Sequence, residues 1–127
     1  MARKFDLTEP NLTKKLARFA DLAKFPNTVE VADAYKLEDK FELAGNWAKE
    51  LFQNENPITL ELACGKGEYS VGQGAMYPHR NFIGVDIKGN RIWKGAKQAL
   101  EDGLSNVGFL RASINHLDKL FAKGEVD

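Results

Sequence analysis

Two apolar runs near the middle of the chain each end in residues that can hold a ligand. The first run leads into a turn with Gly65 and Gly67, and the second ends on Asp86, about 20 residues later. Glycine lets a backbone turn sharply and approach a ligand closely, and a helix that starts there offers free N–H groups. A carboxylate at this spacing is typical of nucleotide-binding folds, where it accepts hydrogen bonds from the ribose hydroxyls. The pattern predicts a site for a cofactor that contains adenosine.

The turn lacks the motifs that bind phosphate in the common nucleotide folds. A dinucleotide fingerprint needs a third glycine where this chain has Ser70, and a P-loop needs Ser or Thr after its lysine, whereas Gly67 follows Lys66. Glu61 and Glu68 flank the turn with negative charge, which would repel a pyrophosphate. S-adenosylmethionine has a sulfonium centre, an amino-acid tail and no phosphate, so it tolerates nearby carboxylates. We therefore expect S-adenosylmethionine as the ligand, and an ordinary strand–turn–helix without a ligand is the alternative.

From residue 57 onward, apolar runs alternate with helical patterns. Such alternation predicts an α/β fold with a doubly wound parallel sheet and right-handed crossovers. Strands are predicted at residues 58–63, 81–86 and 107–111, and helices at about 68–76, 91–101 and 115–122.

The chain divides into two parts by its pattern. Residues 1–56 are mixed and polar, and they predict a small N-terminal helical extension packed on the main domain. Residues 57–127 are expected to be the first half of a Rossmann-like domain, truncated after the third strand. Residues 125–127 look like the approach to a fourth strand, without which the strand at 58–63 would be an open edge prone to association.

Four segments, in this order and at matching intervals, resemble the bacterial tRNA (guanine-N7-)-methyltransferases. The resemblance is close from about residue 57 to residue 127 and looser before it. It implies a class I methyltransferase fold, S-adenosylmethionine as methyl donor, and N7 of a guanosine in tRNA as acceptor. The segments are LELACGKGE at 60–68, FIGVDIK at 82–88, NVGFLR at 106–111 and FAKGEV at 121–126.

The resemblance also implies which residues hold the donor. Glu61 and Asp86 fall on the two carboxylates that contact it in the family. The family often has Gly at the position of Ala63 and Asp at that of Ser113, so a contact from Ser113 to the adenine would carry no charge. No catalytic residue is expected within this chain, because the family's Pro-Asp-Pro segment follows the fourth strand. The other implied contacts are Gly65 and Gly67 along the methionine moiety, beside Ala63, and Ile87, Lys88, Ser113 and Ile114 around the adenine.

Composition is that of an ordinary globular chain, with 127 residues, 43% of them apolar and 28% charged. The single cysteine, Cys64, excludes an internal disulfide framework and suits a cytoplasmic location. No apolar run approaches the roughly 18 residues that span a bilayer, so no membrane partner is expected. His79 and His116 lie far apart without companion ligands, so no metal site is expected.

Charge is balanced overall but uneven along the chain. Net charge is zero, yet residues 1–25 carry six basic and three acidic side chains. Lys14, Lys15 and Arg18 are therefore candidate contacts for tRNA phosphates, with a solvated helix face as the alternative. Trp93 could stack on adenine or RNA but is expected to pack, and Cys64 is expected to be a small turn residue and not a nucleophile.

Two other functions stay open from the sequence. The chain could belong to a class I methyltransferase with a small-molecule or protein acceptor, since any such enzyme could share the first two segments. It could also be a non-catalytic module that binds a nucleotide or nothing, such as a nicotinamide-binding domain with a degenerate turn.

Overall fold

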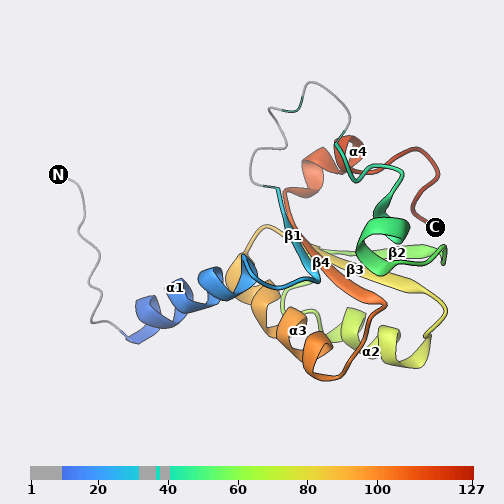
Figure 1. Cartoon of the computed structure of the whole chain (residues 1–127). Coiled ribbons are helices and arrows are strands. Elements are labelled where there is room, and N and C mark those ends of the chain that lie inside the picture. The colour runs from blue at the N-terminus through green and yellow to red at the C-terminus, as the bar shows by residue number, and fades with distance from the viewer. Residues whose placement is uncertain (1–9, 32–36, 38–40) are drawn as a thin grey trace.

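Four parallel strands form one sheet within residues 10–31, 37 and 41–127, the part of the chain that the computed structural model describes. Every neighbouring pair of strands is parallel. Across the sheet the order is β1-β4-β3-β2, so the three strands that the alternation predicts lie side by side (Figure 1). The strands are β1 (Thr28–Glu30), β2 (Ile58–Leu62), β3 (Asn81–Asp86) and β4 (Val107–Arg111).

Helices cover both faces of this sheet, which confirms the predicted doubly wound α/β fold (Figure 1). On one face lie α2 (Glu68–Met76) and α3 (Gly89–Glu101), with α1 (Pro10–Leu22) packed against α3. On the other face lie three short elements, the π-helical turn η2 (Ala48–Phe52), the 3-10 turn η3 (Ile114–His116) and α4 (Leu117–Leu120). The helix predicted at about 115–122 is thus divided between η3 and α4.

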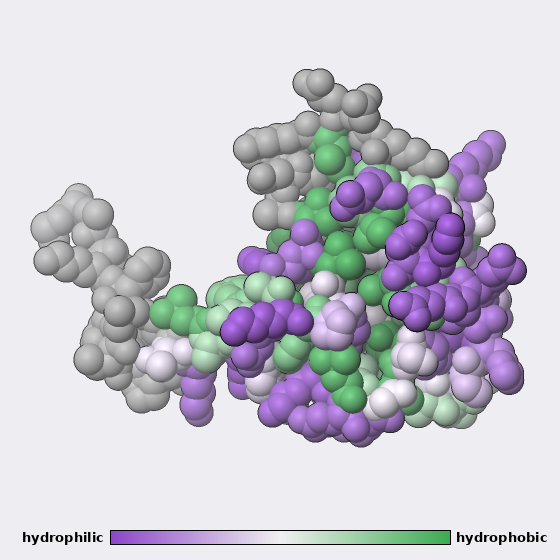
Figure 2. Space-filling view, viewed as in Figure 1, coloured by the Kyte–Doolittle hydropathy of each residue, from purple (hydrophilic) through white to green (hydrophobic). Residues whose placement is uncertain are grey.

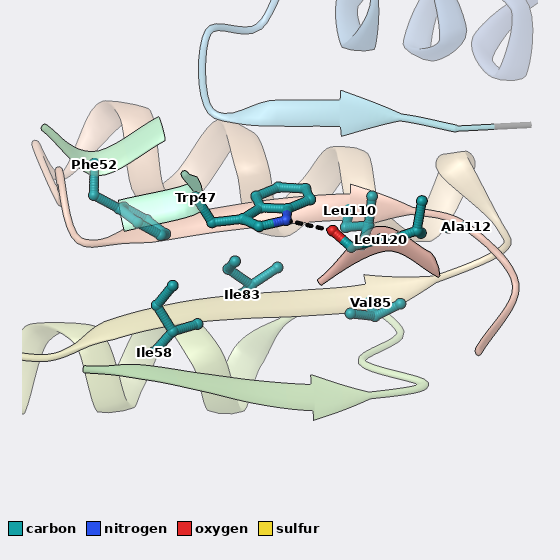
Figure 3. Packing of buried hydrophobic residues seen from close by; sticks show 8 residues of the cluster. All are labelled: Trp47, Phe52, Ile58, Ile83, Val85, Leu110, Ala112 and Leu120. Carbon is teal, nitrogen blue, oxygen red and sulfur yellow. Dashed lines mark hydrogen bonds between the residues drawn. The ribbon is translucent and has the colours of Figure 1, made fainter. Parts of the chain in front are cut away.

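Trp47 is the centre of the core on the η2 and α4 side (Figure 3). Its indole N–H donates a hydrogen bond to the carbonyl of Leu120 at 2.7 Å. Its ring stacks on that of Phe121, with centroids 4.8 Å apart. The carboxylate of Glu125 accepts hydrogen bonds from the backbone N–H groups of Gly45 and Trp47. Residues before β2 and residues after β4 therefore pack together on this face.

Phe109 is the centre of the core on the α2 and α3 side, and its ring is fully buried. Three glycines surround it: a Cβ on Gly67, Gly84 or Gly95 would lie within 2.8 Å of the ring. Real Cβ atoms do not approach that closely, so only glycine lets the turn, β3 and α3 all contact the same aromatic ring.

Trp93 holds α1 across α3. Its indole N–H donates to the carboxylate of Asp21 at 2.8 Å, and the guanidinium carbon of Arg18 lies 4.5 Å from the ring centroid. Arg18 also donates to Oδ1 of Asn90 at 3.0 Å. Through its contacts with Asp21 and Arg18, Trp93 packs between α3 and α1, as predicted.

β1 is a strand that the sequence analysis missed. It adds to the edge of the sheet beside β4, in register from Thr28 opposite Phe109 to Glu30 opposite Arg111. Three residues are too few to show an alternating pattern, so the sequence gives no local signal for this strand. Its strand conformation depends on the backbone pairing with β4. The predicted helical extension thus contributes a strand as well as a helix.

The last residues of the chain approach the other edge of the sheet, as predicted. Val126 forms a parallel bridge with Ile58, and the N–H of Asp127 donates to the Ile58 carbonyl at 2.8 Å. Among the described residues, no other pairs with this edge of β2.

Candidate functional site

The turn between β2 and α2 lies at the carboxyl edge of the sheet, where ligands bind in open parallel sheets. Ala63, Gly65 and Gly67 all have positive φ, at 55°, 58° and 72°. Glycine adopts these angles freely, whereas a residue with a Cβ is strained by about 1–2 kcal/mol. Glycine at two of the three positions lets the backbone adopt this turn without strain there, and Ala63 is strained at the third.

Asp86 ties this turn to the end of β3. Its Oδ2 accepts a hydrogen bond from the N–H of Gly65 at 2.9 Å, and its Oδ1 accepts one from the N–H of Lys88, also at 2.9 Å. The side chain is nearly buried, at 8% exposed. Each carboxylate oxygen has two lone pairs, so both oxygens can still accept a hydrogen bond from a ligand hydroxyl.

Glu61, the second candidate carboxylate, is fixed by a buried serine. Its Oε1 accepts a hydrogen bond from the hydroxyl of Ser70 at 2.7 Å, and Ser70 is almost completely buried in the first turn of α2. Ser70 occupies the position where a dinucleotide fingerprint has its third glycine. Here α2 therefore begins beside a carboxylate, where a dinucleotide fold would place its pyrophosphate.

A pocket of about 320 Å³ opens between β2 and the start of α2. Two carboxylates and one ammonium group line it, which suits a ligand with an ammonium group and a carboxylate and opposes a polyphosphate. The lining residues are Glu61, Cys64, Lys66, Glu68 and Tyr69.

Cys64 reports the electrostatic character of this region. Burial, and then the carboxylates of Asp86 and Glu61, raise the pKa of its thiol from the ordinary 9.0 to about 12. At this pKa the thiol stays protonated at neutral pH. Cys64 is buried in the cluster around Phe109, as predicted for a small packing residue. The same negative surroundings that oppose a thiolate favour a cationic ligand.

The ends of β3 and β4 bring a second group of candidates to the same edge. Asp86 is paired in register with Arg111, so the residues that follow the two strands lie beside each other. Ile87 after β3 is 54% exposed, and Ile114 after β4 is 50% exposed. Ser113 caps η3 through its hydroxyl oxygen, which leaves the hydroxyl proton available as a donor. Two exposed isoleucines here offer an apolar surface for a flat base.

Residues 55–127 match the model of a protein family described as "Putative methyltransferase". The chain belongs to this methyltransferase family. Its sheet is accordingly a Rossmann-like methyltransferase sheet.

Proteins named tRNA (guanine-N(7)-)-methyltransferase are similar to most of this methyltransferase chain. That of Bacteroides fragilis is 51% identical over 112 residues, which are 88% of this chain and 44% of the relative. That of Christiangramia forsetii is 48% identical over 112 residues, 88% of this chain and 50% of the relative. That of Porphyromonas gingivalis is 56% identical over 89 residues, 70% of this chain and 36% of the relative. The chain spans about half the length of the curated relatives it matches.

The structure gathers most of the predicted donor contacts of this methyltransferase chain. Hydrogen bonds join Asp86 to the turn, and the strand register brings the segments after β3 and β4 together. Gly67 also has a packing role, since it is buried and a Cβ there would collide with the ring of Phe109. Its lack of a Cβ lets the turn pack closely, while Gly65 has open space where a Cβ would lie.

The predicted tRNA contacts divide into two kinds. Arg18 is occupied by Trp93 and Asn90 within the molecule, so its first role is to hold α1 in place. Lys14 and Lys15 are exposed on α1. Of the other basic residues in this segment, Lys24 is exposed just after α1, and Arg3 and Lys4 lie outside the described residues.

Sequence reasoning missed two residues that shape the site, Ser70 and Phe109. The signal for Phe109 was present in Gly67, Gly84 and Gly95, whose common neighbour becomes evident only in the fold. Within the described residues, no three His, Cys, Asp or Glu side chains are placed to hold a metal ion. No helix in that part of the chain is long and apolar enough to cross a membrane.

Proposed function

We propose that the protein carrying this chain transfers a methyl group from S-adenosylmethionine to N7 of a guanosine in tRNA, and that this chain holds the donor. The observation that carries the proposal is the pair of fixed carboxylates, Asp86 and Glu61, on either side of the turn in a methyltransferase sheet. Curated relatives at 48–56% identity that bear the tRNA (guanine-N(7)-)-methyltransferase name support the acceptor. The same acceptor would place the reaction in the cytoplasm.

The residues present fit this donor. Asp86 would accept hydrogen bonds from the ribose hydroxyls with the lone pairs that Gly65 and Lys88 leave free. Glu61 and the backbone of the turn at Ala63, Gly65 and Gly67 would surround the methionine moiety, whose ammonium group the carboxylates favour. The adenine would lie against Ile87, Lys88, Ser113 and Ile114.

The chemistry asks little of the protein beyond placement. The donor, when bound, supplies a methyl group activated by a sulfonium leaving group. Guanine N7 has a free in-plane lone pair at neutral pH, so no base has to remove a proton before attack. Catalysis then consists chiefly of holding nucleophile, methyl carbon and leaving sulfur on one line. Asp86 and Glu61 would contribute by holding the donor, and with it the methyl carbon and the leaving sulfur, in a fixed position.

The test is a methylation assay with the full-length protein, total tRNA and S-adenosylmethionine labelled in the methyl group. The expected result is labelled 7-methylguanosine in digested tRNA, at one mapped position. Label in a small molecule or protein, with none in tRNA, would instead support a class I methyltransferase with another acceptor. A thermal shift with NAD and none with S-adenosylhomocysteine would indicate a nucleotide-binding module, since a ligand that binds only the folded state raises its stability.

A further inference from the structure

A row of basic side chains runs along the exposed face of α3. Lys88, just before the helix, is followed at every third residue by Arg91, Lys94 and Lys97, all exposed. Residues three apart are neighbours on a helix surface, about 4.5 Å apart along the axis. No Asp or Glu occurs from residue 87 to residue 100. The chain as a whole has no net charge, so this row is a local excess.

Three of these four cations form no ion pair with an acidic side chain in the described part of the chain. Lys97 pairs with Glu101 at 3.7 Å and lies over the ring of Trp93. Lys88, Arg91 and Lys94 form no ion pair with any described residue. The free end of the row is therefore the end nearest the candidate donor site, where the backbone N–H of Lys88 donates to Asp86.

A second pocket lies beside the row, in the groove between α2 and α3. It measures about 290 Å³, and Lys66 and Lys94 are among the residues that line it. Gly72 and Gly95 are in its lining, and at Gly72 a Cβ would meet no atom within 4 Å. Glu68 also lines it and is its one acid, against two cations.

The surface is held in shape by the contacts of α1. Arg18 lies over Trp93 and bonds to Asn90, which precedes Arg91 in the first turn of α3.

Hydrophilic side chains gather along the lower side of the molecule, where α3 lies (Figure 2). The only large apolar side chain exposed on α3 is Leu100, at its far end. A helix that lies on a membrane needs several such side chains, so this row does not suit a lipid surface.

We infer that Lys88, Arg91, Lys94 and Lys66 form a docking surface for an RNA backbone that leads to the donor site. The inference rests on the proposed function, because it names where the substrate of that site binds. Cations attract phosphates whatever the base sequence, and Arg91 and Lys94 form no ion pair with a described acidic residue that would compete for them. A strand lying along the row from Lys97 toward Lys88 would reach the edge of the sheet where Asp86 and Ile87 lie.

The test compares two double variants of the full-length protein. Arg91→Ala with Lys94→Ala removes two cations of the row, both outside the donor contacts. Lys49→Ala with Lys123→Ala is the matched control, since both lysines are exposed and lie with η2 and α4 on the opposite face of the sheet. The dissociation constant for tRNA is measured from low to physiological salt, and the binding of S-adenosylhomocysteine is measured for each variant.

The row variant is expected to bind tRNA at least tenfold more weakly at low salt, with a salt slope smaller by about two, one unit for each lost phosphate contact. Its affinity for S-adenosylhomocysteine is expected to stay unchanged, as is the salt slope of the control. In the methylation assay the loss would appear in KM for tRNA and not in kcat.

Equal tRNA affinity and equal salt slope in both variants would overturn the inference while leaving the proposed function intact. Loss of binding to phosphatidylserine vesicles in the row variant, with unchanged tRNA binding, would overturn it in favour of a membrane surface. If the unaltered full-length protein binds no tRNA at any salt concentration, the proposed function itself fails, and the RNA surface fails with it.

Discussion

Asp86 accepts a hydrogen bond from the backbone N–H of Gly65 at 2.9 Å, so the carboxylate at the end of β3 holds the turn that follows β2. Sequence reasoning assigned Asp86 to the ribose alone. The structure gives it a second task that precedes binding, because the turn must be in place before a ligand can meet it. Under the proposed function, ligand affinity and local stability would therefore be coupled at this one side chain.

Replacement of Asp86 by Ala is expected to weaken both properties. Hydrogen bonds to a charged group contribute about 1.5–3 kcal/mol, so affinity for S-adenosylmethionine is expected to fall roughly 10- to 100-fold. The free energy of unfolding is also expected to fall, because the N–H groups of Gly65 and Lys88 lose their acceptor. Calorimetry on the full-length protein measures the first effect and urea unfolding the second. Wild-type affinity in a variant that has lost stability would limit Asp86 to holding the turn.

A methyl group added to Gly95 tests whether the close packing beneath the turn matters for ligand binding. A Cβ there would lie 2.5 Å from the carbonyl oxygen of Lys66 and 2.8 Å from the ring of Phe109. Since the carbonyl belongs to the turn, Gly95→Ala is expected to displace the turn, to destabilise the fold by about 1–3 kcal/mol and to reduce donor affinity.

Gly72→Ala is the matched control for that experiment. Gly72 lies inside α2, and a Cβ there would meet no atom within 4 Å. Alanine favours a helix by about 1 kcal/mol over glycine, so this variant is expected to be stabilised and to bind the donor normally. If both alanine variants behaved alike in urea unfolding, the packing around Phe109 would not explain why Gly95 is a glycine.

How much the sequence could predict depended on the range of the interactions involved. The strands at 81–86 and 107–111 match β3 and β4, and the one predicted at 58–63 matches β2 to within one residue, because long apolar runs bounded by turn residues are local signals. Asp86 could be proposed as a site residue for the same reason, since it ends such a run, whereas Glu61 lies inside β2 and was proposed from the family resemblance.

The parts that could not be predicted depend on contacts between distant segments. Arg18 was a candidate RNA contact because its sequence neighbours are basic. Only the fold shows that its guanidinium lies over the ring of Trp93. β1 is too short to carry a pattern of its own, and β4 decides where it pairs. The Ser70–Glu61 hydrogen bond joins residues nine apart across a turn whose shape no propensity scale describes.

Ala63 is the position in the turn where a stabilising change is expected. Its φ of 55° strains a residue with a Cβ by about 1–2 kcal/mol, and glycine relieves this while adding roughly 0.4–1 kcal/mol of unfolded-state entropy. Ala63→Gly is therefore expected to raise the free energy of unfolding by about 0.5–1 kcal/mol in urea titrations. Ala63→Val is the contrasting variant and is expected to destabilise the fold, because a β-branched residue tolerates this angle worst. A less stable glycine variant would mean that the turn is not strained.

Cys64 is expected to make the stability of the fold depend on pH in the alkaline range. Its folded pKa is about 12, above the ordinary 9.0, because burial and the nearby Asp86 and Glu61 carboxylates oppose the thiolate. A raised pKa means that the folded state holds the proton more tightly than the unfolded chain does. The contribution is therefore complete below pH 9 and is lost as the pH rises from 9 toward 12.

Urea unfolding between pH 8 and 11 measures this effect, with Cys64→Ala as the comparison. The unaltered protein is expected to lose stability more steeply above pH 9 than the alanine variant, which lacks the titrating group. In the native protein the thiol is also expected to resist iodoacetamide at pH 8 and to react once urea unfolds the chain, because the alkylation needs an accessible thiolate. Rapid labelling of the folded protein at pH 8 would show instead that Cys64 is accessible and ionised, and that the pocket beside Glu61 is less negative than its carboxylates indicate.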